Sequence, residues 1–437
     1  MTETMSLPAG LTMAGGVLAL GGAPLDRPLA ALRTLEPQAS AFWAYDLDQI
    51  EARAARFRRA FAPLRARPAY ALKANALPAV LERVCAAGLA AEAGSLGELL
   101  VAKRTGFGAA DRNLNGNGRT VAEAAFAARE GVHSVNADHA AELDLLEREA
   151  RAAGATVRVA LRVNPGIETP GHRYVATGDD AAKFGIAPAE ALDAWAARAR
   201  WPHLRVDGVH LHVGSQLLDG APLERAAETA RALVAESAAR GAPLSLVNLG
   251  GGFGVDYSDA GAEFPLERHA AHLVERFGDL AVEWLFEPGR WIVAPAGVLV
   301  AEVLWVKERP GPDGATRRFV VLAAGMNDLI RPALYHARHR VVPVRPRAGA
   351  ATPAVVVGPV CESADIFERE AMLPPIERGD LVAILDAGAY GAVMASNYNG
   401  RPRLAELTVT GGRWTRARAG EPADAAAGRA SEDRLEG

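Results

Sequence analysis

Cysteine is nearly absent from the chain, which contains only Cys85 and Cys361 among its 437 residues. Two thiols cannot supply the several bridges of a disulfide-stabilised secreted domain, so the sequence predicts a protein of a reducing compartment. The apolar stretch GGVLALGGAPL near the N-terminus follows no basic residue and is short and glycine-rich. It does not fit a secretory signal peptide, and we expect a cytoplasmic protein.

An excess of charge of one sign and long apolar runs are also lacking. The 48 Lys and Arg residues nearly balance the 52 Asp and Glu residues, and the formal net charge is −4. A charge this small produces no field that would attract nucleic acid or an anionic membrane. No segment of the sequence approaches the ~18 to 20 consecutive apolar residues of a membrane-spanning helix. These absences favour a protein that acts on a small molecule.

What the sequence does contain is a regular alternation of short apolar strands and helical patterns over residues 41–295. Eight strand candidates follow one another: PAYALK, LAAEA, RNLN, HSVN, TVRVALRVN, VDGVHLHV, LSLVNL and VEWLFEP. Strands that alternate with helices pair in parallel, and eight such units over ~250 residues are what a closed (β/α)8 TIM-like barrel needs. A doubly wound open sheet is the competing interpretation.

The pattern changes after residue 296, where strand-like runs such as GVLVAEVLWVKE and RRFVVLAAG follow one another without long helices. We interpret residues 296–417 as a separate antiparallel β-barrel domain, and we expect residues 1–40 to join it with their own short strands. The composition of residues 418–437, rich in Ala, Gly, Glu, Asp and Arg, predicts a disordered tail. The expected fold class is therefore α/β, with a barrel and an added β domain.

Several helix starts carry recognisable capping residues. Asp46 precedes a helix whose buried face is marked by apolar residues three and four apart, namely Leu47, Ile50, Ala54, Phe57 and Phe61. Ser95 with Glu98, and Thr120 with Glu123, have the spacing of a capping box.

The first strand candidate ends in a lysine, within the sequence PAYALKANAL. Burying an ammonium without a partner costs on the order of several kcal/mol, so Lys73 must be solvated, paired or used chemically. Alternation along the strand puts Ala69, Ala71 and Lys73 on one side, whose small side chains suit a barrel interior. Active sites of such barrels lie at the carboxyl ends of the strands, although Lys73 alone also fits a lysine that reaches solvent from the rim.

A glycine-rich turn follows the seventh strand candidate, in VNLGGGFGVDY. Gly250, Gly251 and Gly252 expose backbone amides where an anion can bind. The spacing matches neither a dinucleotide fingerprint nor a P-loop, so taken alone a tight turn is an equal interpretation. FEPGRW then places Glu287 and Arg290 after the eighth strand, beside the barrel sector where phosphate sites recur.

Two histidines close the sixth strand candidate, in HLHVGSQ. His210 and His212 share one face, but no third ligand follows at a recognisable spacing, so we predict no metal site. An imidazole packed flat against a planar group is as good an interpretation. Ser215 adds a hydroxyl donor for an anion.

A lysine, a carboxylate on a neighbouring strand, a flat ring and a glycine turn together describe pyridoxal phosphate held as a Schiff base. Nine motifs support this interpretation: YALKAN, LRVNPG, ATGDDAAKFGI, HVGSQ, GGGFGVDY, EPGR, AGMNDLIRPALY, GPVCESAD and DAGAYGAVMASNYN. From about residue 40 to residue 410 the chain resembles the fold-type III pyridoxal-phosphate decarboxylases, and among them the diaminopimelate decarboxylases. The resemblance implies decarboxylation of meso-2,6-diaminopimelate to L-lysine, the last step of lysine biosynthesis.

The resemblance also implies roles for individual residues. Lys73 would carry the cofactor, His212 would stack on its ring, and Glu287 would bond the pyridine nitrogen. The remaining implied cofactor contacts are Ser215, Gly250, Gly251, Gly252, Gly289, Arg290 and Tyr390. Cys361, which without its motif reads as a small apolar residue, would return a proton to the substrate carbon. It would do so across the interface of a homodimer whose active sites are shared.

The same resemblance implies how the substrate is recognised, since diaminopimelate ends in both an amine and a carboxylate. Arg331 and Arg290 would receive the distal carboxylate, and Glu362 would face the distal ammonium. Tyr335 and Tyr390 would complete the substrate pocket. A substrate without that carboxylate would leave a buried arginine unpaired, at a cost on the order of 2 to 5 kcal/mol.

Two alternatives remain open. Glu92 stands where the resemblance leads us to expect aspartate, and Leu96 where glycine is common. A decarboxylase of ornithine, lysine, arginine or a modified amino acid is therefore the second interpretation. The third is a catalytically silent paralogue that regulates a decarboxylase, and the presence of Lys73 and Cys361 argues against it.

Overall fold

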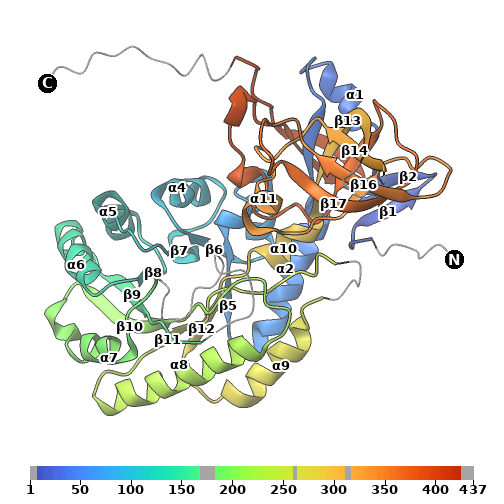
Figure 1. Cartoon of the computed structure of the whole chain (residues 1–437). Helices are drawn as coiled ribbons and strands as arrows, with labels where there is room; N and C mark the ends of the chain where they lie inside the picture. Colours follow the sequence, from blue (N-terminus) through green and yellow to red (C-terminus); the bar gives the residue numbers. More distant parts are fainter. Residues whose placement is uncertain (1–6, 168–182, 259–262, 311–315, 425–437) are drawn as a thin grey trace, which may run out of the picture. The chain divides into compact units, whose positions relative to one another are not determined.

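The computed structural model describes residues 7–167, 183–258, 263–310 and 316–424. These residues divide into two compact units, each described here by itself (Figure 1). The barrel unit consists of the described residues between Ile50 and Asp256 and from Glu263 to Ile292. The β unit consists of those before Ile50, the pair Tyr257–Ser258, and those after Ile292.

Eight parallel strands close into a ring in the barrel unit, in the order β10-β11-β12-β5-β6-β7-β8-β9 (Figure 1). They are β5 (Arg67–Ala71), β6 (Ala90–Ala93), β7 (Arg112–Leu114), β8 (Ser134–Ala137), β9 (Val157–Arg162), β10 (Leu204–His210), β11 (Leu246–Asn248) and β12 (Glu283–Phe286). Each strand overlaps one of the eight sequence candidates, and β5, β8 and β10 extend beyond theirs by one or two residues. The closed ring confirms the barrel and excludes the open sheet.

The main helices around these strands are α2 (Leu47–Phe61), α3 (Pro78–Ala86), α4 (Leu96–Arg104), α5 (Val121–Glu130), α6 (Ala141–Ala153), α7 (Pro188–Ala196), α8 (Ala221–Ala239), α9 (Leu266–Phe277) and the short α10 (Arg290–Val293). None of the described helices is both long enough and apolar enough to cross a membrane.

The predicted caps are present, one of them in altered form. Asp46 Oδ1 accepts hydrogen bonds from the backbone amides that follow it, at 3.0 and 3.1 Å. Thr120 and Glu123 form the complete capping box. Ser95 Oγ accepts from the Glu98 amide, but the Glu98 carboxylate accepts from the Gly94 amide instead of returning to Ser95.

Small and branched apolar side chains fill the interior of the barrel. One buried cluster joins Ala69, Ala90, Ala160, Leu246 and Leu285. Since these residues come from strands on different sides of the ring, they meet inside it. The prediction that Ala69 faces the interior is therefore confirmed. A filled interior confines any ligand to the ends of the strands.

The β unit contains a nine-stranded sheet with the main path β17-β16-β14-β13-β4-β19-β20, and β18 pairs with both β13 and β15. The strands are β4 (Ala41–Asp46), β13 (Gly297–Pro310), β14 (Thr316–Leu322), β15 (Val341–Pro343), β16 (Thr352–Val357), β17 (Ile366–Leu373), β18 (Leu381–Ile384), β19 (Glu406–Thr410) and β20 (Arg413–Arg418). The unit also has a small sheet, β1 (Leu11–Ala14), β2 (Val17–Leu20) and β3 (Ala23–Pro24), and the helices α1 (Pro28–Arg33) and α11 (Arg331–Tyr335).

Pairing in this sheet is antiparallel with two exceptions. The β14·β16 and β4·β19 pairs are parallel. Among the described strands the sheet is an open, branched path, because the long β13 pairs with β4 and β18 along its first half and with β14 along its second. The β domain predicted from the sequence is present, and its pairing is less regular than that of an antiparallel barrel.

The division of the chain differs from the predicted boundary at residue 41. β4 (Ala41–Asp46) pairs with β13 and β19 of the β unit, and Tyr45 donates a hydrogen bond to Glu406 at 2.8 Å. All six residues of β4 are buried, as expected for a strand that has a paired neighbour along each edge. Of the predicted tail, Arg418 ends β20, and residues 425–437 lie outside the described part of the chain.

Candidate active site

Every strand of the barrel has a polar side chain at or just beyond its carboxyl end. In ring order from β5 these are Lys73, Glu92, Asn115, Asn136, Arg162, His210, Asn248 and Glu287. In a closed parallel barrel the carboxyl ends of all strands meet at one face, which is where active sites lie. The eight side chains therefore define the candidate active site.

Lys73 lies in a short 3-10 turn, Leu72–Ala74, and not on the strand itself, which ends at Ala71. The predicted strand alternation therefore stops two residues before the lysine. The Lys73 side chain is 50% exposed, and its Nζ lies 3.4 Å from Oε2 of the buried Glu92. The ammonium is thus both paired and accessible, as a lysine that condenses with a carbonyl group must be.

The rest of the PAYALKANAL stretch holds this turn in place. Asn75 is buried, and its Oδ1 accepts a hydrogen bond from the Leu77 amide at 3.0 Å. The Tyr70 hydroxyl donates to the Asn75 carbonyl at 3.0 Å. The polar groups that look misplaced in an apolar run therefore end the strand and present Lys73 at the face of the barrel.

Glu287 is a buried carboxylate surrounded by amide donors. Asn248 and Asn136 donate to its Oε1 at 2.7 and 3.1 Å, and Asn115 donates to its Oε2 at 3.2 Å. His210 Nε2 lies 3.6 Å from Oε2. An ionised carboxylate accepts hydrogen bonds only, so a ring of donors favours its charged form.

The two buried glutamates have pKa values shifted in opposite directions. Burial by itself raises the pKa of Glu287, but His210, Lys73 and the Asn248 amide outweigh it and hold this pKa well below its usual range. Burial raises the pKa of Glu92 to about 7, against the attraction of Lys73. The site therefore holds one firmly ionised acid, Glu287, and one acid, Glu92, whose burial favours the protonated form.

The two histidines of HLHVGSQ have different neighbours: His210 lies beside Glu287, whereas His212 contacts the glycine turn. His212 Nδ1 accepts a hydrogen bond from the Gly251 amide at 3.1 Å, which assigns the ring proton to Nε2. Burial, with Arg162 and Lys73 nearby, lowers the pKa of His212 well below its usual value, so the ring is neutral. Within the described residues no group of three His, Cys, Asp or Glu side chains could hold a metal ion.

The glycine turn after β11 is packed too closely to accept side chains. A Cβ on Gly250 would lie 2.6 Å from His212 Nδ1, and a Cβ on Gly251 would lie 2.5 Å from the Glu287 carbonyl oxygen. The amides of both glycines are already used, by Asn248 Oδ1 at 2.8 Å and by His212. The predicted contact of the Gly250–Gly252 turn with phosphate stays a prediction.

Two of the three side chains predicted to bind phosphate, Ser215 and Arg290, lie together. Arg290, at the start of α10, donates a hydrogen bond to Ser215 Oγ at 3.2 Å. Gly289 packs against the lysine turn, since a Cβ there would lie 3.1 Å from the Cβ atoms of both Ala71 and Ala74. The EPGR segment therefore carries Glu287 and Arg290 and packs against the turn that carries Lys73.

The predicted substrate residues Arg331 and Tyr335 lie on α11 of the β unit. The Arg331 side chain is buried, and its Nη1 lies 2.7 Å from His339 Nε2. Its guanidinium also stacks on the Tyr257 ring, 4.8 Å from the centroid. Arg331 is therefore held rigidly within its unit, as a group that discriminates between substrates should be.

Tyr390, Cys361 and Glu362 also lie in the β unit. Tyr390 has a positive φ of 56°, a conformation that a bulky residue adopts only when its surroundings impose it. Such strain is often found at functional sites. Cys361 and Glu362 are exposed in the loop between β16 and β17.

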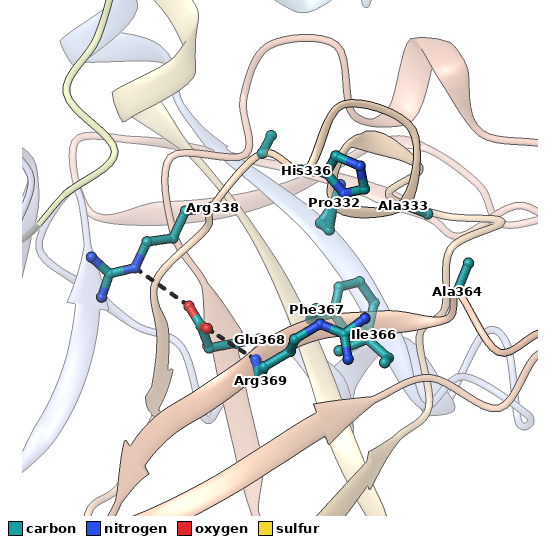
Figure 2. Close-up of a pocket in the computed structure, with 10 residues that line it drawn as sticks. Pro332, Ala333, His336, Arg338, Ala364, Ile366, Phe367, Glu368 and Arg369 are labelled. Atoms are coloured by element: carbon teal, nitrogen blue, oxygen red, sulfur yellow. Dashed lines mark hydrogen bonds and ion pairs between the residues drawn. The ribbon is translucent and has the colours of Figure 1, made fainter. Parts of the chain in front are cut away.

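A pocket of about 360 Å³ lies between α11 and β17 of the β unit (Figure 2). Figure 2 shows Glu368, one of its lining residues, bonded by the Arg338 side chain at 3.4 Å and by the Arg369 amide at 2.9 Å. Arg331, Tyr335 and Glu362 do not line it. We therefore do not assign the predicted substrate site to this pocket.

Sequence reasoning missed the three asparagines around Glu287 and also Arg162. Arg162 ends β9, 3.3 Å from Asp138 and stacked on the Phe184 ring. The available signal was that the strand candidates RNLN, HSVN and LSLVNL each contain an asparagine at the same end. Their common target became visible only when the ring closed. The motif ATGDDAAKFGI lies partly outside the described residues, and nothing is concluded from it.

Comparison with known proteins gives the family. The profile of the family described as "Pyridoxal-dependent decarboxylase, pyridoxal binding domain" matches residues 47–294, which span the barrel. The chain belongs to this family of pyridoxal-dependent decarboxylases. It is accordingly an enzyme whose cofactor is pyridoxal phosphate, as the sequence predicted.

Three relatives are similar to this chain over most of its length. It is 39% identical to a diaminopimelate decarboxylase of Zymomonas mobilis over 79% of this chain and 81% of that protein. A diaminopimelate decarboxylase of Helicobacter pylori solved with L-lysine has a TM-score of 0.84 at 34% identity, covering 90% of this chain and 97% of the other. A lysine/ornithine decarboxylase of Vibrio vulnificus solved with putrescine has a TM-score of 0.75 at 25% identity, covering 89% and 99%.

The residues of the barrel face fit the cofactor of the family. Lys73 can take an aldehyde as an imine, Glu287 is an ionised acid for a ring nitrogen, and the neutral ring of His212 can stack. Ser215 and Arg290 offer donors to a phosphate. The glycine turn beside them packs directly against the His212 ring and the Glu287 backbone.

Proposed function

We propose that this chain decarboxylates meso-2,6-diaminopimelate to L-lysine and carbon dioxide, in the last step of lysine biosynthesis. The observation that carries the proposal is the accessible Lys73 in the same barrel face as the ionised Glu287. The proposal is supported by the 39% identity to a diaminopimelate decarboxylase and by the similarity to one solved with the product L-lysine.

Pyridoxal phosphate, when bound, supplies an electron sink for the electron pair that remains when the carboxylate leaves as carbon dioxide. In this proposal Lys73 would hold the cofactor, and its amine, once free, would accept a proton from the substrate amine. Glu287, fixed by its amide donors, would keep the ring nitrogen protonated, and the flat ring of His212 would pack against the cofactor ring. Ser215, the turn Gly250–Gly252, Arg290 and Tyr390 would hold the phosphate, and Gly289 would lie beside the cofactor.

Substrate selection is assigned to residues of the β unit and to Arg290. Arg331 receives the distal carboxylate, with Arg290, and Glu362 faces the distal ammonium. Tyr335 and Tyr390 close the pocket. The buried position of Arg331 supports this role, because a charge held in a dry site discriminates strongly against a substrate that lacks the opposite charge.

We further propose a homodimer in which Cys361 and Glu362 act in the barrel of the partner subunit. Support comes from the exposure of Cys361 and Glu362 in the single chain. A group that returns a proton to a reacting carbon is expected in an enclosed site, which the partner subunit would supply. Cys361 returns a proton to the α-carbon after carbon dioxide has left. A free thiol with this task requires a reducing compartment, which supports a cytoplasmic location.

A second candidate function is decarboxylation of lysine or ornithine. The similarity to the lysine/ornithine decarboxylase of Vibrio vulnificus favours it, and so does the contact of Arg331 with His339, which already occupies one nitrogen of the guanidinium. The two candidates differ in whether a distal carboxylate is required.

The test measures carbon dioxide release from meso-diaminopimelate, ornithine, lysine and arginine by the purified holoenzyme. We expect diaminopimelate to be preferred by at least about 30-fold in kcat/KM, the effect of one unpaired buried charge. Arg331→Ala should reduce diaminopimelate turnover far more than that of lysine. Lys73→Ala should lose all turnover and the visible absorption of the lysine-bound cofactor, whereas Lys103→Ala, which removes a surface lysine, should retain both.

Preference for lysine or ornithine would support the second candidate. Equal losses on all substrates in Arg331→Ala would show that Arg331 does not recognise the distal carboxylate. A coloured and active Lys73→Ala enzyme would contradict the assignment of the cofactor lysine.

A further inference from the structure

Two adjacent residues in the β unit contact two adjacent residues of the loop that carries Cys361. Asn399 Oδ1 accepts a hydrogen bond from the Cys361 backbone amide at 2.9 Å. The Tyr398 hydroxyl donates a hydrogen bond to the Glu362 carboxylate. Asn399 therefore bonds Cys361, and its neighbour Tyr398 bonds Glu362, the neighbour of Cys361.

The backbone at Asn399 is shaped for this contact. Asn399 has φ 57° and ψ 23°, in the left-handed region, where most residues with a side chain are strained by about 1 kcal/mol or more. Asparagine tolerates this region better than most residues and also offers an acceptor oxygen. The sequence thus places at this position a residue that satisfies both the backbone and the Cys361 amide.

The loop is also fixed at its other end. Asp365 accepts hydrogen bonds from the Val360 amide and from the Met326 amide, both at 2.7 Å. Met326 belongs to the segment that leads into α11 and Arg331. The loop with Cys361 and Glu362 is therefore held between Asp365 on one side and the Tyr398–Asn399 pair on the other.

Stability does not explain the Tyr398–Asn399 contacts. Tyr398, Asn399, Cys361 and Glu362 are all exposed in the single chain. Hydrogen bonds between exposed groups replace equally good bonds to water, so they add little to the free energy of unfolding. What these contacts do supply is direction, because they fix the backbone at Cys361 and the side chain of Glu362.

We propose that Tyr398 and Asn399 are positioning residues, which aim the Glu362 carboxylate and the Cys361 thiol at the substrate. This inference rests on the proposed function, in which Cys361 returns the proton and Glu362 reads the distal ammonium. The Glu362 contact raises the pKa of the Tyr398 phenol, so the hydroxyl stays protonated and keeps its role as donor.

Asn399 is tested by the pair Asn399→Gly and Asn399→Asp. Glycine accepts the left-handed backbone and removes only the acceptor, whereas aspartate keeps an acceptor oxygen in the same place. We expect Asn399→Gly to lower kcat by about tenfold, the effect of one lost hydrogen bond, with KM within about twofold of the wild-type value. Lysine released per carbon dioxide should fall below one, because the carbanion is then protonated elsewhere. Asn399→Asp should recover most of both quantities.

Tyr398 is tested by Tyr398→Phe, which keeps the ring and removes the hydroxyl. Since Glu362 is assigned to substrate recognition, we expect KM for diaminopimelate to rise by about tenfold while kcat changes little. In the double variant with Glu362→Gln the two effects should not add, because Tyr398 acts only through Glu362. Additive effects would overturn this half of the proposal.

A readout independent of turnover separates failure of the inference from failure of the proposed function. The rate at which iodoacetamide alkylates Cys361 in the holoenzyme should change in Asn399→Gly and return in Asn399→Asp, with melting temperatures within a few degrees of wild type. Wild-type enzyme that does not consume diaminopimelate would contradict the proposed function alone. Asn399→Gly enzyme with wild-type kcat, product ratio and alkylation rate would overturn the positioning role.

Discussion

At the scale of single residues, the site depends on how the surroundings of each charged group set its protonation. Glu92 and Glu287 are the same residue type on neighbouring parts of one barrel face, yet burial raises the pKa of one to about 7 and donors hold the pKa of the other low. The difference comes from His210 and Lys73, which with the Asn248 amide lower the pKa of Glu287, while Asn115 and Asn136 complete its hydrogen bonds. An acid that must stay ionised beside a pyridine nitrogen needs such donors.

The first prediction concerns Glu287→Gln. The new amide group would point at least one N–H toward the asparagine donors, and the negative charge opposite the ring nitrogen would be lost. We expect kcat to fall by about 100-fold or more, as for loss of an acid–base group. Steady-state kinetics of the cofactor-loaded variant measures this.

A matched control lies at the other end of the same strand. Glu283 begins β12 and pairs with Arg158 at 2.5 Å and His133 at 2.9 Å. Because the amino ends of barrel strands contribute to stability and not to catalysis, Glu283→Gln should lower the melting temperature and leave kcat near the wild-type value. Equal kcat losses in both variants would contradict the role given to Glu287.

At the scale of elements, the turns after the strands matter more than the strands. The 3-10 turn Leu72–Ala74 presents Lys73, and Gly289 packs against it at van der Waals distance. The glycine turn after β11 packs against His212 and Glu287. These turns are the places where one chain segment approaches another so closely that only a hydrogen fits at Cα.

The second prediction concerns Gly251→Ala. The added Cβ would lie 2.5 Å from the Glu287 backbone carbonyl oxygen, which cannot move without shifting Glu287 itself. Overpacking of this kind costs about 1 to 3 kcal/mol, so we expect the affinity for pyridoxal phosphate to fall by roughly 5- to 150-fold. Titration of the visible absorption of bound cofactor measures the affinity. Gly118→Ala, where a Cβ meets open space, is the control and should bind as tightly as wild type.

At the scale of the whole molecule, stability depends on pH through a buried acid far along the chain from the barrel motifs. Asp328 is buried in the β unit, and burial raises its pKa to about 7, with Arg401 acting in the opposite direction and Asp365 in the same one. In the unfolded chain the pKa returns to about 3.8. The folded state therefore binds a proton that the unfolded state has released between these two values.

The third prediction follows from this sign. Wild-type stability should fall as pH rises from about 4 to about 7, by up to about 4 kcal/mol in total, and should level off above that range. In the wild type, Asp328 accepts a hydrogen bond of 2.9 Å from the Gly325 amide. The Asp328→Asn side chain keeps an acceptor oxygen for this amide but cannot ionise. Its free energy of unfolding relative to wild type should therefore increase from pH 5 to pH 8.5, as measured by urea denaturation. The exposed Asp193→Asn should show no such trend, and a pH-independent difference for Asp328→Asn would contradict the assignment.

Much of the architecture was predictable because it depends on local patterns. The eight strand candidates, the Asp46 cap and the Thr120–Glu123 capping box need only neighbours a few residues away. The position of β4 was not predictable, because a strand at Ala41–Asp46 could begin either unit. Its partners β13 and β19 lie more than 250 residues away in the sequence, where no local pattern can indicate them.

The amino-acid sequence by itself determined the family and the cofactor, because residue types and their spacing within short motifs carry that chemistry, and it predicted Lys73 and Glu287 as the lysine and the acid of the site. Only the tertiary structure decided which side chains surround them. Asn115, Asn136 and Asn248 meet at Glu287 because the ring closes, and Asn399 reaches Cys361 because two loops fold together. Hydrogen bonds act over about 3 Å, and only the folded chain brings residues so distant in sequence within that range.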